Sequence, residues 1–467
     1  MAPARSDGFP PAVPPWPPDV IARWSGGIWQ GTPPPLIRGF SFDTRSIRPG
    51  DLFLALRGET RDGHDYISDA LARGAVGTIV DRDDVAGGGA PLLRVASVRE
   101  ALGRIATGHR QTLTLERIAV TGSFGKTTVK ELLAAMLSTS APTVKSQGNW
   151  NNDLGLPMTL LATTPAHRFG VYEVGMNHPG ELDPLCAILA PRIGIVTGVG
   201  PVHLEAFDSI AGIAHEKAAV CRCLPPDGLA ILPLDDPWFQ TLSDHATAPV
   251  RTVSLQPGRG DYTLHRDPAT GWIDLHENAA GETCRAKPSL EGAYFALDAG
   301  LAAAAARACG IPWSGIVHAI ETYHPLPLRW ERHDLAGCRI VNDAYNANPV
   351  SMRAAIEALL ETAAEGTLWL VLGGMLELGP EEELLHRELG DWIASKARVR
   401  LITLGARAAW IGHGAAAAGM KPHPVTGPVE AARILHDHAR PGDHVLLKGS
   451  RGEAVERVLH HWKTLLS

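Results

Sequence analysis

The chain has 467 residues, of which 45% are hydrophobic and 20% are charged, and its formal net charge is −7 with the histidines neutral. This length exceeds one ordinary hydrophobic core, so we expect about three domains. The balanced composition excludes a disordered or fibrous chain. The mild acidity excludes a dedicated nucleic-acid binder, which needs clustered Lys and Arg to neutralise phosphates.

The cysteine pattern and the apolar runs indicate the cellular compartment of the protein. Six cysteines are scattered, and the close pair Cys221 and Cys223 lacks the two-residue spacer of a redox or zinc motif. The N-terminal segment has no apolar core of the kind a signal peptide requires, and the sequence has no run of about 18 apolar residues. We therefore expect reduced thiols, no membrane partner and a cytoplasmic location.

The first predicted elements follow a proline-rich opening. This opening, through Pro35, predicts an irregular lead-in, because proline lacks the N–H that helix interiors and central strands use. Residues 52–58 and 74–82 are then short apolar runs that flank a helical pattern over residues 66–73. This arrangement is typical of a small α/β domain that ends near Thr112.

Two further units alternate strands and helices. From Glu116 onward, four apolar runs alternate with helical segments, which predicts a mostly parallel sheet covered on both faces. The turn-rich residues 238–290 predict a β insertion before an alanine-rich helix at 293–309. Near Leu326 a third unit begins, with four strand-like runs typical of a nucleotide-binding sheet. We predict an α/β fold with three domains: a small N-terminal domain at 1–112, a central parallel-sheet domain at 113–325 and a C-terminal Rossmann-like domain at 326–467.

Residues 120–128 (VTGSFGKTT) follow a predicted strand and open a predicted helix, which is the context of a phosphate-binding loop. Lys126 supplies a charge for the β and γ phosphates, and Thr127 offers a hydroxyl to Mg²⁺. The loop is compressed, because Val120 stands where the usual pattern has its first glycine. The alternative is a Gly-Ser turn with a solvated lysine. We predict nucleotide binding by Gly122, Ser123, Phe124, Gly125, Lys126, Thr127 and Thr128.

This loop, followed at once by Lys130 and Glu131, resembles the ATP-binding signature of the Mur ligases. Further blocks resemble the same family in the same order. They are an Asn-rich block at 148–157, an acidic block at 173–177, a histidine block at 200–205, a lysine block at 213–217, Arg329, and the C-terminal blocks 342–349 and 448–451. The family usually has Asp at position 374, where this chain has Gly374.

The resemblance implies an ATP-dependent ligase that forms an amide bond through an acyl phosphate. The sequence YNANP at 345–349, with Ser351 and Met352 after it, is similar to the family members that add D-alanyl-D-alanine to a UDP-N-acetylmuramoyl tripeptide. The expected small-molecule partners are therefore that tripeptide, D-alanyl-D-alanine and ATP with Mg²⁺ at two sites. The chain is expected to act as a monomer.

The resemblance also implies catalytic and metal-binding roles for Lys126, Glu173, His203 and Lys217. Thr127 and Glu173 would bind the magnesium of ATP, while His203 and a carbamylated Lys217 would bind the second ion. Taken singly, these residues have other interpretations. Glu173 fits a strand-end salt bridge, His203 a structural hydrogen bond, and Lys217 a solvated charge or an ion pair.

Substrate contacts are implied in two parts of the chain. In the N-terminal domain the expected residues for the uridine diphosphate are Thr44, Arg45, Asp62 and His64. For Thr44 and Arg45, a polar turn before a strand is the alternative. The muramoyl peptide is expected at Asn149, Asn151 and Asn152, although these residues also suit a helix cap.

In the C-terminal domain, Arg329 would reach the phosphates, and Tyr345 with Asn346 would meet the adenine or ribose. Three other interpretations remain open. The first is another ligase of the superfamily, such as a folylpolyglutamate synthase or a different Mur amino-acid adder. The second is a P-loop kinase or a switch GTPase, and the third is a catalytically silent binding protein, for which Gly374 is the only sign.

Overall fold

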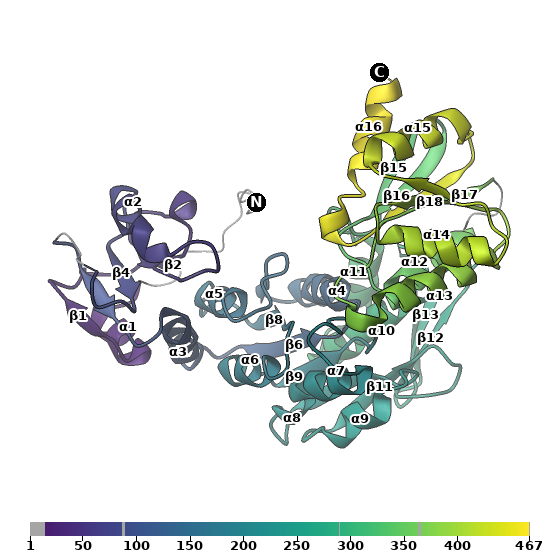
Figure 1. Cartoon of the computed structure of the whole chain (residues 1–467). Helices are drawn as coiled ribbons and strands as arrows, with labels where there is room; N and C mark the ends of the chain where they lie inside the picture. The colour runs from purple at the N-terminus through teal and green to yellow at the C-terminus, as the bar shows by residue number, and fades with distance from the viewer. Residues whose placement is uncertain (1–14, 86–88, 289, 363–365, 467) are drawn as a thin grey trace. The chain divides into compact units, whose positions relative to one another are not determined.

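The computed structural model of the chain describes residues 15–85, 89–288, 290–362 and 366–466 (Figure 1). The chain forms two compact units. The first contains residues 1–119, 141–176 and 182–193, and the second contains residues 120–140, 177–181 and 194–467. Both units combine sheets and helices, so the predicted α/β class is confirmed. None of the helices in the described part of the chain has the length and apolar character needed to cross a membrane.

The N-terminal part of the first unit is a five-stranded sheet in the order β1-β5-β4-β3-β2. Strands β2 to β5 are parallel and β1 is an antiparallel edge. All residues of β3 and β4 are buried, because these strands lie inside the sheet. The strands are β1 (Ile28–Gln30), β2 (Gly39–Ser41), β3 (Asp51–Leu54), β4 (Gly77–Val80) and β5 (Leu92–Arg94), and the helices are α1 (Pro18–Ser25), α2 (Ile67–Ala72) and α3 (Val98–Arg110).

The irregular lead-in predicted through Pro35 is wrong for its second half. Helix α1 begins at Pro18, where a proline is tolerated because the first turn of a helix leaves its N–H groups unpaired. After the helix, β1 pairs with β5 at the edge of the sheet. The prolines therefore mark a helix start, while residues 1–14 lie outside the described residues.

The first unit also contains part of the central region. Strand β7 pairs with β8 in parallel, and all five residues of β8 are buried. These elements carry the predicted acidic and Asn-rich blocks. They are β7 (Thr143–Lys145), α5 (Gly155–Leu161), β8 (Phe169–Glu173) and α6 (Leu182–Leu189).

Helix α4 (Lys126–Ser138) of the second unit follows β6 (Glu116–Thr121), whose first four residues belong to the first unit, and this is the order predicted for the phosphate loop. Strands β10, β11 and β12 are parallel, whereas β12, β13 and β14 are antiparallel, so the turn-rich segment is a β insertion as predicted. The remaining elements are β9 (Ile193–Val196), α7 (Ile210–Lys217), α8 (Ala219–Arg222), β10 (Leu229–Pro233), α9 (Phe239–Asp244), β11 (Val250–Ser254), β12 (Tyr262–Arg266), β13 (Ile273–Glu277), β14 (Glu282–Ala286), α10 (Ala293–Ala308) and α11 (Trp313–Glu321).

The C-terminal part of the second unit is a six-stranded sheet in the order β15-β16-β20-β17-β18-β19. Only β15 is antiparallel, so the loops after the other strands gather at one edge, where such sheets bind ligands. Helices α12 to α14 pack on one face and α15 with α16 on the other (Figure 1). The elements are β15 (Glu331–Leu335), β16 (Cys338–Asp343), α12 (Pro349–Thr362), β17 (Leu368–Leu372), α13 (Glu382–Ala394), β18 (Val399–Leu404), α14 (Ala408–Ala417), β19 (His423–Val425), α15 (Pro428–His438), β20 (His444–Lys448) and α16 (Arg457–Leu466).

Candidate active site

The loop between β6 and α4 needs glycine at two positions. Gly122 has φ +153° and Gly125 has φ +75°, which only glycine adopts without strain. A Cβ atom on Gly122 would lie 2.0 Å from Oγ1 of Thr197, and one on Gly125 would lie 2.3 Å from Oδ1 of Asp298. The backbone of the loop is therefore pressed against neighbouring segments, and a larger residue at either position would displace it.

Side chains hold this loop from both sides. Ser123 Oγ donates to the carbonyl of Gly200 and accepts from its N–H, both at 3.0 Å. Thr197 Oγ1 donates to the carbonyl of Phe124. These bonds hold the loop in the shape described.

Helix α4 begins directly after the loop. Lys126 is its first residue, and its ammonium donates to the carbonyl of Gly122 at 2.7 Å, so the side chain folds back over the loop. Thr127 is buried in the first turn, and the N-cap residue of the helix is Gly125, which has no side chain of its own. A helix N-terminus with a lysine beside it is positive, which suits an anion such as a phosphate.

Two buried ionisable groups belong to the same unit. Burial lowers the pKa of the Lys217 ammonium well below its usual range, and the charge of Lys126 lowers it further, against the opposing effect of Glu216. Burial also raises the pKa of the Asp298 carboxyl well above its usual range. Sequence reasoning missed Asp298, whose signal was a lone acid in the alanine-rich helix α10.

The loop after β9 contacts the C-terminal part of the unit. His203 Nδ1 lies 2.5 Å from Oε2 of Glu377, and this hydrogen bond lowers the pKa of the Glu377 carboxyl. Asn348 Nδ2 donates to the carbonyl of Ser123 at 3.4 Å. Asn348 lies in the block 342–349 that the sequence analysis marked, and Glu377 lies three residues after Gly374, although their contacts were not predicted.

No three His, Cys, Asp or Glu side chains come together as a metal site in the described residues. A magnesium site at this loop would therefore also need other oxygen donors, such as the Thr127 hydroxyl or phosphate oxygens.

The structure brings together the three C-terminal residues expected to bind nucleotide. The guanidinium of Arg329 lies 3.9 Å from the ring centroid of Tyr345, a cation–π contact. Lys448 Nζ donates to the carbonyl of Asn346 at 3.1 Å and to Asp343 Oδ2 at 2.5 Å. These contacts order the loop after β16, and its binding of nucleotide stays a prediction.

The space beside Gly374 is filled by other side chains. A Cβ atom on Gly374 would lie 2.6 Å from Cβ of Arg407 and 3.2 Å from Oε1 of Glu453. An aspartate at this position would therefore displace Arg407. The carboxylate of Glu453 lies close to the position that the side chain of an aspartate at residue 374 would take.

In the first unit, Glu173 at the end of β8 accepts a hydrogen bond from Nδ2 of Asn151 at 2.9 Å. Its backbone N–H donates to Ser146 Oγ at 3.0 Å. Asn152 caps α5 by accepting from the N–H groups of Leu154 and Gly155, as its alternative interpretation held. The carbonyl of Asn149 accepts from the N–H of Asn151. Their substrate roles stay predictions.

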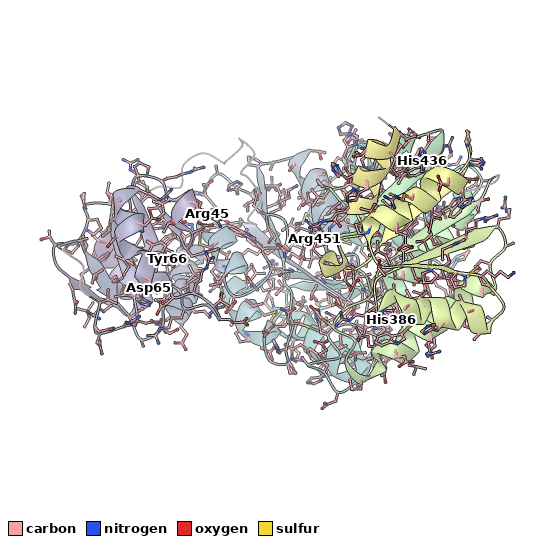
Figure 2. The ribbon with its side chains drawn as sticks, turned by 45° about the horizontal axis from the view of Figure 1, so that its top comes forward. Arg45, Asp65, Tyr66, His386, His436 and Arg451 are labelled. Atoms are coloured by element: carbon pink, nitrogen blue, oxygen red, sulfur yellow. The ribbon has the colours of Figure 1, made fainter. Side chains whose placement is uncertain are left out.

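The residues predicted to bind the diphosphate form local polar turns. Arg45 pairs with Asp43 at 2.6 Å and its side chain is 71% exposed (Figure 2). Neighbouring Thr44 donates to Asp69, which lowers the pKa of that carboxyl. This is the polar turn that the sequence left open as an alternative, and a role for Thr44 and Arg45 in diphosphate binding stays a prediction.

His64 is buried beside Asp62. Its Nδ1 donates to Asp62 Oδ1 at 2.6 Å, and its Nε2 accepts from the N–H of Asp81 at 3.3 Å. Burial alone would raise the pKa of Asp62, but hydrogen bonds from His64 and Arg82 lower it to about 2. Both ring nitrogens of His64 are therefore occupied within the chain.

Comparison with known proteins identifies the family. The model of the Mur ligase family catalytic domain matches residues 36–110, that of the Mur ligase middle domain matches 120–306, and that of the Mur ligase glutamate ligase domain matches 328–451. The chain belongs to the Mur ligase family. Each match falls within one of the three predicted domains, whose boundaries remain predictions.

Relatives within this family cover most of the chain. A UDP-N-acetylmuramoyl-tripeptide–D-alanyl-D-alanine ligase of Escherichia coli is 34% identical over 89% of this Mur ligase and 92% of its own length. The ligase of the same name from Bacillus subtilis is 32% identical over 91% and 93%. The three-domain α/β fold predicted from the sequence is confirmed by a solved structure of MurF from Acinetobacter baumannii, which has a TM-score of 0.89 at 31% identity and covers 97% of this chain and 100% of that one. A MurF ligase from Thermotoga maritima, solved in complex with ADP, has a TM-score of 0.79 at 27% identity and covers 92% and 97%.

Proposed function

We propose that this Mur ligase joins D-alanyl-D-alanine to a UDP-N-acetylmuramoyl tripeptide with the consumption of ATP. The observation that carries the proposal is the agreement of two relatives with this activity in their names over about nine-tenths of both chains. The loop geometry supports it, since a tightly packed glycine-bearing turn before a helix N-terminus suits a triphosphate. The ADP held by the Thermotoga maritima neighbour supports nucleotide binding.

The reaction would proceed in two steps. A carboxylate oxygen of the tripeptide attacks the γ phosphorus of ATP, so that ADP leaves and an acyl phosphate forms. The amine of D-alanyl-D-alanine then attacks the acyl carbon, phosphate leaves, and the amine loses a proton. In the first step two anions meet, and the chain would contribute positioning and positive charge from the α4 N-terminus and Lys126 rather than a covalent bond.

Magnesium would supply further positive charge between the carboxylate and the phosphates. We assign Thr127 and Glu173 to one ion, and His203 with a carbamylated Lys217 to the second. The carbamate would form when the Lys217 nitrogen adds carbon dioxide and releases a proton, which replaces a cation with an anionic oxygen ligand. The lowered pKa of Lys217 favours the neutral amine that this addition needs.

The test is phosphate release by the purified full chain with ATP, Mg²⁺ and UDP-N-acetylmuramoyl tripeptide. Four amines are compared at equal concentration: D-alanyl-D-alanine, lysine, diaminopimelate and glutamate. Release that requires both the tripeptide and D-alanyl-D-alanine, with the amide product seen by mass spectrometry, is the expected result. A preference for another amine would assign a different amino-acid adder, and amine-independent hydrolysis with a preference for GTP would reject the ligase.

A further inference from the structure

The loop after β17 and the loop after β9 are in close contact through one side-chain pair and one glycine. Glu377 Oε2 lies 2.5 Å from Nδ1 of His203. Two residues later, a Cβ atom on Gly379 would lie 2.6 Å from the carbonyl oxygen of Leu204. The contact therefore needs glycine at position 379, and it joins the C-terminal sheet to the segment that carries His203.

Both partners of this pair have an unusual backbone. His203 has φ +55° and Glu377 has φ +65°, the left-handed region that is uncommon outside glycine, although histidine adopts it more often than glutamate does. Such conformations persist only where the surrounding structure enforces them, and they gather at functional sites. Here the two left-handed residues face each other, so the conformation of each loop places its side chain against the other.

Hydrogen bonds to the two residues before Glu377 hold its loop in place. The N–H of Met375 donates to Nε2 of the buried His386, which is labelled in Figure 2, at 2.9 Å. The N–H of Leu376 donates to Ser450 Oγ at 3.0 Å. His386 lies on α13 and Ser450 lies in the loop after β20, so two separate segments hold the loop. Glu377 is thus presented by an anchored loop, although its own side chain is 54% exposed.

The pair also sets the state of the histidine ring. An ionised carboxylate only accepts hydrogen bonds, so Nδ1 of His203 carries the proton in this contact. In a neutral ring the lone pair then resides on Nε2, which is the form that binds a metal ion. Carboxylates that hold the second nitrogen of a metal-binding histidine fix its tautomer and orientation, and their loss weakens metal binding.

We propose that Glu377 is a positioning residue that holds His203 in the tautomer and orientation needed to bind a divalent cation at the active site. The inference rests on the proposed metal-binding role of His203. Because Glu377 comes from the C-terminal sheet and His203 from the loop after β9, the ligand is correctly set only while these two segments are in contact. Contact of the C-terminal sheet with this loop therefore completes the metal site.

The test measures Mn²⁺ binding by electron paramagnetic resonance. The full chain is used with a non-hydrolysable ATP analogue and UDP-N-acetylmuramoyl tripeptide, and two bound ions are expected. Glu377→Ala should weaken one of them by roughly 10- to 100-fold. Glu377→Gly should do the same, because glycine adopts the left-handed backbone without strain while the carboxylate is lost with the rest of the side chain. Glu381→Ala, at an exposed carboxylate four residues away, is the matched control and should leave both ions unchanged.

A double-mutant cycle with His203→Ala completes the design. If Glu377 acts through His203, His203→Ala and the double variant should bind Mn²⁺ equally weakly. A merely structural bridge would change the melting temperature and leave Mn²⁺ affinity intact, which would overturn the inference. If His203→Ala weakens Mn²⁺ binding while Glu377→Ala and Glu377→Gly do not, the positioning role alone is rejected. If His203→Ala also has no effect, the proposed metal role of His203 fails with it.

Discussion

The phosphate loop and the N-terminal polar turns reach order in different ways. In the phosphate loop, Gly122 and Gly125 are fixed by side chains far away in sequence, and Lys217 in the same unit is 2% exposed. In the N-terminal turn, Arg45 is held by Asp43, two residues away, and its side chain is 71% exposed. Tertiary packing therefore shifts the pKa values of buried groups in the unit of the phosphate loop, such as Lys217 and Asp298. The N-terminal turns, in contrast, are local structures exposed to water. Substitutions in the phosphate-loop unit should therefore have larger effects on activity and stability than substitutions in the N-terminal turns.

The largest effect is expected at Lys217. Lys217→Ala should lower kcat by on the order of 10²- to 10³-fold, because a group that stabilises charge in the transition state is lost. A small carboxylate such as formate should partly restore activity by entering the space left by the side chain. The measurement is the steady-state ligation rate with and without formate.

Lys217→Met is the matched control, since it keeps the volume of the side chain and leaves no space for formate. It should be as inactive as the alanine variant and should not respond to formate. Full activity of either variant would show that burial of this lysine serves packing alone.

The next effect is expected at Gly125. Gly125→Ala adds a Cβ atom 2.3 Å from Asp298 Oδ1 and forces alanine to φ +75°, so ATP affinity should fall by about 10- to 100-fold. Adding Asp298→Ala removes the clash but not the backbone strain, so the double variant should recover only part of the loss. Isothermal titration calorimetry with a non-hydrolysable ATP analogue measures this affinity. Wild-type affinity in the single variant would contradict the packing described for the loop.

A smaller effect concerns stability and pH. Burial raises the pKa of Asp298 above its ordinary 3.8, so the folded chain binds a proton that the unfolded chain releases as pH rises. The wild type thus loses stability as pH rises above this ordinary value, until the pKa of the folded state is passed. Asp298→Asn does not titrate and should melt a few degrees higher at pH 8, with a smaller gap at pH 5. A gap independent of pH would mean that Asp298 is ionised in the fold.

The same contrast explains which features of the structure could be predicted from the sequence. Strand and helix runs are local, so the loop before α4 and the strand-like runs of the C-terminal sheet were predicted from apolar patterning. The contact of Glu377 with His203 joins residues far apart in sequence, and the packing of Asp298 against Gly125 depends on α10, so no local pattern shows either. The helix at Pro18 was missed because proline was taken as a breaker at a position where it starts a helix.

The smallest structural effect is expected at Arg45. This residue tests whether the exposed N-terminal turn has only a local structural role. Its ion pair with Asp43 is exposed, and such pairs contribute little to stability, so Arg45→Ala should leave the melting temperature unchanged. If the guanidinium also binds the diphosphate, KM for the UDP-linked tripeptide should rise about tenfold with kcat and KM for ATP unchanged. Asp43→Asn is the control, because it removes the charge of the partner and keeps the arginine. An unchanged KM in Arg45→Ala would leave this turn with a purely structural role, and the functional part of the N-terminal domain would have to lie elsewhere.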